Sequence, residues 1–273
     1  MTLDRALARW SSGWRGPAVA ALIAFLAGLP GLIAVPTLDR DEARFAQASA
    51  QMMESGDFVV IRFQDAPRFK KPVGIHWLQA ASVTAVSSPE ARQIWAYRLP
   101  SLLGAMLAAA ACAWGAAVFF GAEGGLIAGA LLGAGLLVST EAFIAKTDSM
   151  LNGTIVLGMA ALARLYAARR GGPAAPRSAV WIFWGAMAAS ILIKGPVGPM
   201  VAALAVISLS AAERDVRWLA GLKPYWGLIV ILAVVGPWAG AVTVATDGGF
   251  WSAAIGGDLA PKLAGGHESH GAP

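Results

Sequence analysis

The sequence predicts an all-α fold, a polytopic membrane helix bundle of about seven transmembrane helices with a helical external loop at the membrane surface. Of the 273 residues, 57% are hydrophobic and only 14% are charged, and the mean hydropathy is +0.62. Several uncharged stretches reach about 20 residues, the length that crosses a bilayer as a helix. Because hydrocarbon holds no water to satisfy backbone groups, such stretches must be helical, and the alternating pattern of a membrane barrel is not seen.

The hydrophobic stretches define seven expected spans, separated by short polar segments. They lie at residues 17–36, 99–119, 125–142, 149–167, 179–193, 195–212 and 225–245. Residues 1–16 are expected to form a cytoplasmic interfacial helix, with Trp10 and Trp14 on its apolar face and arginines among them. Residues 17–245 then form the transmembrane bundle, which includes an external loop at 37–98, and residues 246–273 begin a second large external loop.

The distribution of Lys and Arg predicts the orientation, because cytoplasmic loops carry an excess of both. An N-terminus inside places loop 37–98 outside and three basic clusters inside: Arg5, Arg9 and Arg15; Arg164, Arg169, Arg170 and Arg177; Arg214, Arg217 and Lys223. This requires that residues 71–86 do not cross, and their length of about 16 residues predicts a juxtamembrane or re-entrant helix instead. The net charge of +5 therefore reflects orientation, and no nucleic-acid partner is expected.

Charged residues from separate loops are predicted to gather on the external side. They are Asp41, Glu42, Lys71, Arg98, Asp148, Lys194, His267 and His270. Carboxylates at a membrane mouth can act as a base or bind a cation, and basic side chains can bind a phosphate. His267 and His270, together with Glu268, form a weak candidate for a metal site. No cofactor is certain from the sequence, and a divalent metal is left open.

Each of these residues also has a purely structural interpretation. Asp39 and Glu42 fit the spacing of a capping box, and acids favour the first turn of any helix. Asp148 could begin the fourth span or pair with Lys146. Lys194 could extend its chain towards the headgroups from a Gly-Pro turn, and Lys71 and Arg98 could contact headgroups in the same way. The residue types alone leave both interpretations open.

The order of several short motifs resembles a known family. An acidic pair follows the first span, FKKP ends the loop segment, RLP opens the second span and TD begins the fourth. KGP follows the fifth span, PW lies within the seventh, and GGHESHGAP comes last. This series resembles the ArnT-like and protein O-mannosyltransferase-like glycosyltransferases, family 39 of the GT-C superfamily. The resemblance covers nearly the whole chain, although members are roughly twice as long, so the chain is expected to be a fragment.

The resemblance implies a GT-C-like fold and an enzyme that takes its sugar from a polyprenyl-phosphate donor. It implies transfer, with inversion, to a lipid, glycan or protein acceptor on the periplasmic face of a bacterial inner membrane. Matched motif by motif, it makes Asp41, Glu42 and Asp148 catalytic candidates, and Lys71, Arg98 and Lys194 candidate contacts of the donor phosphate. The chain departs from the family pattern at Phe45, where some members have Tyr, at Lys70, where the ArnT branch has an acid, and at Val73, where many members have a second Pro.

Two other classes of function remain as alternatives. A transporter or flippase of a lipid-linked anion would use the same basic pocket without a base, and spans broken by Gly and Pro are typical of transporters. A non-catalytic membrane subunit would need no site at all. Transfer of sugar from a labelled donor separates the first interpretation from both.

Overall fold

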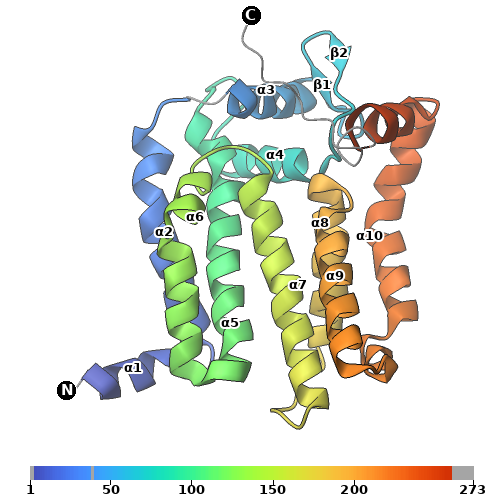
Figure 1. Ribbon diagram of the computed structural model, residues 1–273. Helices are drawn as coiled ribbons and strands as arrows, with labels where there is room; N and C mark the ends of the chain where they lie inside the picture. Colours follow the sequence, from blue (N-terminus) through green and yellow to red (C-terminus); the bar gives the residue numbers. More distant parts are fainter. Residues whose placement is uncertain (1–2, 38–39, 260–273) are drawn as a thin grey trace, which may run out of the picture.

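The chain folds as a bundle of helices with a small hairpin at one end (Figure 1). The computed structural model describes residues 3–37 and 40–259. The helices of the bundle are α2 (Arg15–Ala34), α5 (Ile94–Ala134), α6 (Leu136–Glu141), α7 (Asp148–Arg169), α8 (Ala179–Lys194), α9 (Val197–Glu213) and α10 (Pro224–Ala245). The elements at its two ends are α1 (Leu3–Ser11), α3 (Arg40–Ser55), β1 (Arg62–Phe63), β2 (Ala66–Pro67), α4 (Gly74–Val86), η1 (Arg217–Leu222), α11 (Gly249–Trp251) and η2 (Ser252–Leu259).

Helix α5 is two helices joined by a reversal at Gly121. A straight helix of its 41 residues would measure about 62 Å, twice the hydrocarbon thickness. Gly121 instead has φ 73° and ψ 173°, a conformation that glycine adopts without steric cost. Beyond it the two arms pack antiparallel, with Gly125 against Ala113 and Gly129 against Ala109. The turn that the sequence predicts between the second and third spans is therefore confirmed.

The predicted all-α membrane bundle is confirmed, and each expected span corresponds to one apolar helical segment except 125–142, which is broken at Gly135 between α5 and α6. Four helices of the described chain are long and apolar enough to cross a membrane: α2, α5, α7 and α10. Helix α5 contributes to two of the expected spans, because it reverses at Gly121. Its second arm is followed by α6, which completes the second of these spans. Helices α8 and α9 are apolar but shorter, with 16 and 17 residues.

Small residues let the backbones of the central helices approach closely. Ala20 and Ala24 of α2 pack against Ala109 and Ala113 of α5 in one buried cluster. Between α5 and α7 the approach is closer still, because a Cβ on Gly104 would lie 2.5 Å from backbone atoms of Met150. Lipid gives no hydrophobic drive for helices to associate, so this close van der Waals contact is a main source of attraction between them.

Helices α3 and α4 lie across one end of the bundle, and α1 lies at the opposite end (Figure 1). Helix α4 has 13 residues and measures about 20 Å, which is too short to cross roughly 30 Å of hydrocarbon. It is thus too short to be a span, which agrees with the juxtamembrane or re-entrant helix that the sequence predicts. Helices α3 and α4 therefore lie at the same end of the bundle as the start of α7 and the end of α8.

Replacing Gly104 with Ala should lower stability, because the added methyl group would overlap the backbone of α7. We expect a loss of about 1–3 kcal/mol, seen as a lower unfolding midpoint of the detergent-solubilised protein. Gly236→Ala on α10 is the matched control, since a Cβ there meets no atom within 4 Å. Because Ala favours helix, the control should keep or raise the midpoint. Equal midpoints for the two variants would contradict the close α5–α7 contact.

Candidate functional site

The site begins with Arg98, which is buried where helix α2 ends. Arg98 lies in α5 and is 1% exposed. Its Nη1 donates to the carbonyl oxygens of Gly31, Leu32 and Val35 at 3.3, 3.2 and 2.7 Å, and its Nη2 donates to that of Pro36 at 3.2 Å. The last carbonyls of a helix have no partner within the helix, so this guanidinium caps α2 with a positive charge at its negative end.

Glu42 completes the charge balance of Arg98. Its carboxylate accepts from Arg98 Nε at 2.7 Å and from Nη2 at 3.0 Å, in a bidentate pair. Glu42 Oε1 also accepts from the backbone N–H of Ala145 at 2.9 Å. The pair therefore joins the end of α2, the first turn of α3, α5 and the segment before α7. Both side chains are almost fully buried.

These contacts favour the structural interpretation of Arg98 and Glu42 over the roles that the resemblance implies for them. All five N–H groups of Arg98 have protein acceptors, so none is left for a donor phosphate. Glu42 is 1% exposed, and its carboxylate faces the Arg98 cation and the backbone amide of Ala145. The alternative of a helix-start acid describes Glu42 better, since it lies in the first turn of α3. Asp39, the other half of the proposed capping box, lies outside the described residues.

A second ion pair joins the start of α7 to the end of α8. Lys194 Nζ donates to Asp148 Oδ1, and the two side chains remain 30% and 40% exposed. Lys71 and Lys146 also lie within electrostatic range of the Asp148 carboxylate. Lys146 makes its own ion pair with Glu141 at 3.7 Å. The structure thus brings Asp148, Lys194 and Lys71 together, and Asp148 pairs with Lys194 in place of the Lys146 that its sequence neighbourhood suggests.

Asp41 lies at the same end on the exposed side of α3. Its side chain is 51% exposed and contacts Arg44 Nη1 at 3.4 Å. Arg68, from the strand segment before α4, lies within electrostatic range of both Asp41 and Arg44, and burial lowers its pKa. Neither Arg44 nor Arg68 is among the site residues that the sequence predicts. Arg68 stands two residues before the Lys70-Lys71 pair, and that local run of positive charge is the signal that could have found it.

Phe45 connects the cationic side chains to a buried polar group. Its ring stacks on the ring of His76, with centroids 5.3 Å apart and planes at 21°. Lys71 Nζ and Arg68 Cζ lie 5.3 and 5.4 Å from the centroid of Phe45, within cation–π range. The ring of Phe45, which has no hydroxyl, thus contacts both cations at the position where some members of the family have Tyr.

His76 is held neutral beneath this ring. Its Nδ1 lies 2.8 Å from Ser49 Oγ, and Ser49 Oγ donates to Gln79 Oε1 at 2.6 Å. Ser49 Oγ thus links the imidazole of His76 to the side-chain amide of Gln79 in one buried polar group. Burial, assisted by the charges of Arg68 and Lys71, lowers the pKa of His76 from 6.5 to about 3. A neutral imidazole avoids adding a third positive charge below Phe45.

No metal centre is visible at this end of the bundle. Within residues 3–37 and 40–259, no three His, Cys, Asp or Glu side chains are placed to hold a metal ion together. The weak candidates His267 and His270 lie outside the described residues. Of the expected site residues, those with partly exposed side chains are Asp41 and the group made of Asp148, Lys194 and Lys71, to which the structure adds Arg68.

The chain has relatives among known proteins. No protein-family model matches the chain. The undecaprenyl phosphate-alpha-4-amino-4-deoxy-L-arabinose arabinosyl transferase of Aeromonas salmonicida is 25% identical over 209 residues, which are 76% of this chain and 37% of the relative. The protein of the same name from Pectobacterium carotovorum is 26% identical over 214 residues, 77% of this chain and 37% of the relative.

Solved structures agree with these sequence relatives. ArnT from Cupriavidus metallidurans bound to undecaprenyl phosphate matches with a TM-score of 0.77 and 26% sequence identity. The match covers 89% of this chain and 43% of the ArnT chain. The apo form of the same protein matches with a TM-score of 0.74 and 27% identity, over 87% of this chain and 42% of the ArnT chain. The chain is a relative of the ArnT glycosyltransferases. The predicted resemblance and GT-C-like fold are thus confirmed, and the chain spans less than half the length of the ArnT proteins it matches.

Removing the Glu42 carboxylate should destabilise the fold, because it leaves the buried Arg98 charge unpaired. We expect Glu42→Ala to lower the free energy of unfolding by about 3–5 kcal/mol, measured in detergent. Asp41→Asn, one residue earlier and half-exposed, should change it by less than about 1 kcal/mol. A Glu42→Ala protein as stable as Asp41→Asn would contradict the structural role.

The pKa of His76 predicts a specific sensitivity to acid. The unfolded chain binds a proton at His76 below about pH 6.5 and the folded chain only below about 3, so stability falls as the pH drops through this window. At pH 4.5 the loss attributable to His76 is about 2–3 kcal/mol relative to pH 7.5. His76→Gln should reduce the difference between unfolding midpoints at these two pH values, and an unchanged difference would oppose a buried neutral imidazole.

Proposed function

We propose that the chain is the membrane-embedded part of a glycosyltransferase that takes its sugar from a polyprenyl-phosphate donor. The observation that carries the proposal is the gathering of Lys71, Lys194 and Asp148 at the end of the bundle that also carries Asp41, in a fold related to ArnT. One of the related structures is bound to undecaprenyl phosphate, and relatives are named as arabinosyl transferases. The acceptor is a lipid, glycan or protein that reaches this end of the membrane.

The cations bind the donor phosphate. The isoprenoid tail lies among the bundle helices, and the phosphate contacts Lys71 and Lys194, with Arg68 close by. Arg98 takes no part, because protein oxygens already accept from all its N–H groups. Asp148 holds Lys194 in place before the donor arrives. Lys71 and Lys194 then stabilise the leaving polyprenyl phosphate, whose negative charge grows as its bond to the anomeric carbon breaks.

Asp41 activates or orients the acceptor. Its exposed carboxylate can accept the proton of the acceptor nucleophile as that group attacks the anomeric carbon from the face opposite the leaving phosphate. The new bond forms as the bond to the phosphate breaks, so the anomeric configuration inverts. This scheme uses no metal-dependent step. A transporter or flippase would also bind the anion but would have no use for Asp41, which separates that alternative by experiment.

The proposed orientation places the N-terminus in the cytoplasm and the site on the periplasmic face of a bacterial inner membrane. The end of the bundle that carries α1 is rich in arginine, as cytoplasmic ends are. Its described basic residues include Arg9, Arg15, Arg169, Arg170, Arg177, Arg214, Arg217 and Lys223. Helix α4 does not cross, which keeps all these residues on the same side.

Transfer of labelled sugar tests the proposal directly. Membranes containing the chain are incubated with radiolabelled polyprenyl-phosphate sugars, and label is followed into lipid, glycan and protein fractions. We expect Asp41→Asn to lower the rate at least about 100-fold and Lys71→Met at least about 10-fold, at equal protein levels. Lys70→Met, the exposed neighbour, should have little effect. An unaffected Asp41→Asn protein would remove the assigned role of Asp41, and no transfer by the unmodified chain would remove the proposed activity.

A further inference from the structure

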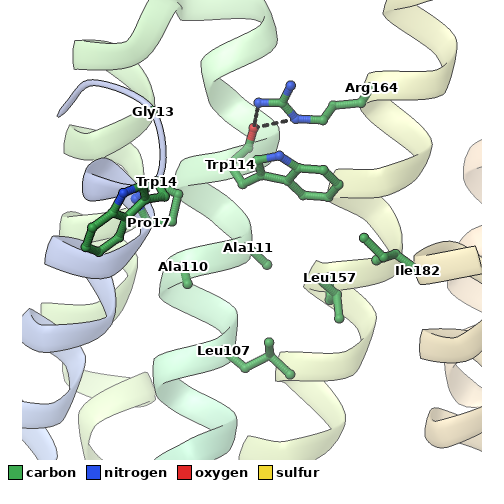
Figure 2. Close-up of a pocket in the computed structure, with 10 residues that line it drawn as sticks. All are labelled: Gly13, Trp14, Pro17, Leu107, Ala110, Ala111, Trp114, Leu157, Arg164 and Ile182. Atoms are coloured by element: carbon green, nitrogen blue, oxygen red, sulfur yellow. Dashed lines mark hydrogen bonds between the residues drawn. The ribbon is translucent and has the colours of Figure 1, made fainter. Parts of the chain in front are cut away.

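A cavity lined in part by Gly13 and Trp14 lies at the α1 end of the bundle, opposite the candidate site. Figure 2 shows the residues that line it. Its volume is about 500 Å³, which is within the range of roughly 300–1,000 Å³ seen for ligand sites. Leu107 and Ala110 of α5, Leu157 of α7 and Ile182 of α8 line its length. Arg164 lies at one end of the cavity and Leu107 at the other (Figure 2). The lining is therefore apolar except for a single guanidinium.

Arg164 has only part of its hydrogen-bonding capacity satisfied. Its Nε and Nη2 donate to the same carbonyl oxygen, that of Trp114, at 3.0 and 2.7 Å. The guanidinium also lies over the Trp114 ring, 4.7 Å from its centroid. Among the described residues no carboxylate forms an ion pair with Arg164. Charged side chains in membrane proteins pair with other charges or with backbone carbonyls, and the carbonyl of Trp114 uses only Nε and Nη2 of Arg164, so its Nη1 remains available to an anion.

The position of Arg164 along the membrane indicates what kind of anion. Arg164 is about 24 Å from Asp148 along α7 and about 8 Å from the end of that helix. It thus lies near the headgroup region at the α1 end, far from the donor phosphate. Trp14, 78% exposed, lies at the same end of the cavity, as Trp does at membrane interfaces.

We propose that this cavity binds an anionic glycerophospholipid from the leaflet at the α1 end. One acyl chain lies along Leu107, Ala110, Leu157 and Ile182, and the phosphate contacts Arg164 on the side that faces away from Trp114. Charge complementarity supports an anionic lipid, since the only charged side chain in the lining is positive. The site is separate from the proposed transfer reaction and does not depend on it.

Native mass spectrometry of the purified chain tests the proposal, with phosphatidylglycerol and phosphatidylcholine of identical acyl chains as probes. The unmodified protein should retain phosphatidylglycerol about fivefold better than phosphatidylcholine, the effect expected for one basic side chain near a headgroup. Arg164→Gln should bring the ratio close to one, and Arg164→Lys should keep most of it. Arg169→Gln, on the same helix and outside this cavity, is the matched control and should leave the ratio unchanged.

A second variant tests the cavity without changing charge. Ala110→Phe fills the apolar channel, so it should remove about one retained lipid per protein while Arg164 stays in place. A ratio that Arg164→Gln leaves unchanged would overturn the proposal, as would equal retention of both lipids by the unmodified protein. Displacement of phosphatidylglycerol by added undecaprenyl phosphate would also overturn it, because the occupant would then be the tail of the donor.

Discussion

The ion pair between Arg98 and Glu42 organises the end of the bundle that carries the candidate site. Arg98 binds the last carbonyls of α2, and Glu42 binds Arg98 at 2.7 and 3.0 Å and the amide of Ala145 at 2.9 Å. Successive helix residues point about 100° apart, so a buried Glu42 turns Asp41 outward. Ala145 precedes Asp148 by three residues. The same carboxylate therefore fixes the positions of both remaining candidate acids.

Hydropathy and local turn chemistry were sufficient to predict the helices from the sequence. The uncharged runs define the spans, FFGAEGG contains the glycine that reverses α5, and the short length of residues 71–86 excludes a crossing. Each of these features depends on residues close together in the chain. The bounds moved by a few residues, since helix ends depend on capping contacts that hydropathy does not report.

The roles within the site were harder to predict, because burial depends on contacts far apart in the sequence. Asp41 and Glu42 are adjacent and chemically alike, and only the partner 56 residues away makes one structural and leaves the other exposed. Lys194 and Asp148 were each expected at the site. Their ion pair was not predicted, because it forms between two helices, α8 and α7, whose contact the sequence does not specify. The Ser49, His76 and Gln79 group carries no sequence signal of its own, since isolated polar residues in apolar helices are common.

Alanine and glycine have two different physical effects in the pairing of α5 with α7. Where Gly104 and Gly153 face the opposite helix, the absence of a side chain lets the backbones touch. Ala110 instead faces the cavity, where a small residue gains nothing from packing against a helix. In a lipid environment a leucine would be as favourable there, because hydrocarbon solvates both. The small side chain of Ala110 leaves space in the cavity for an acyl chain. Arg164 provides the positive charge that an anionic headgroup would contact, so both residues favour the same kind of lipid.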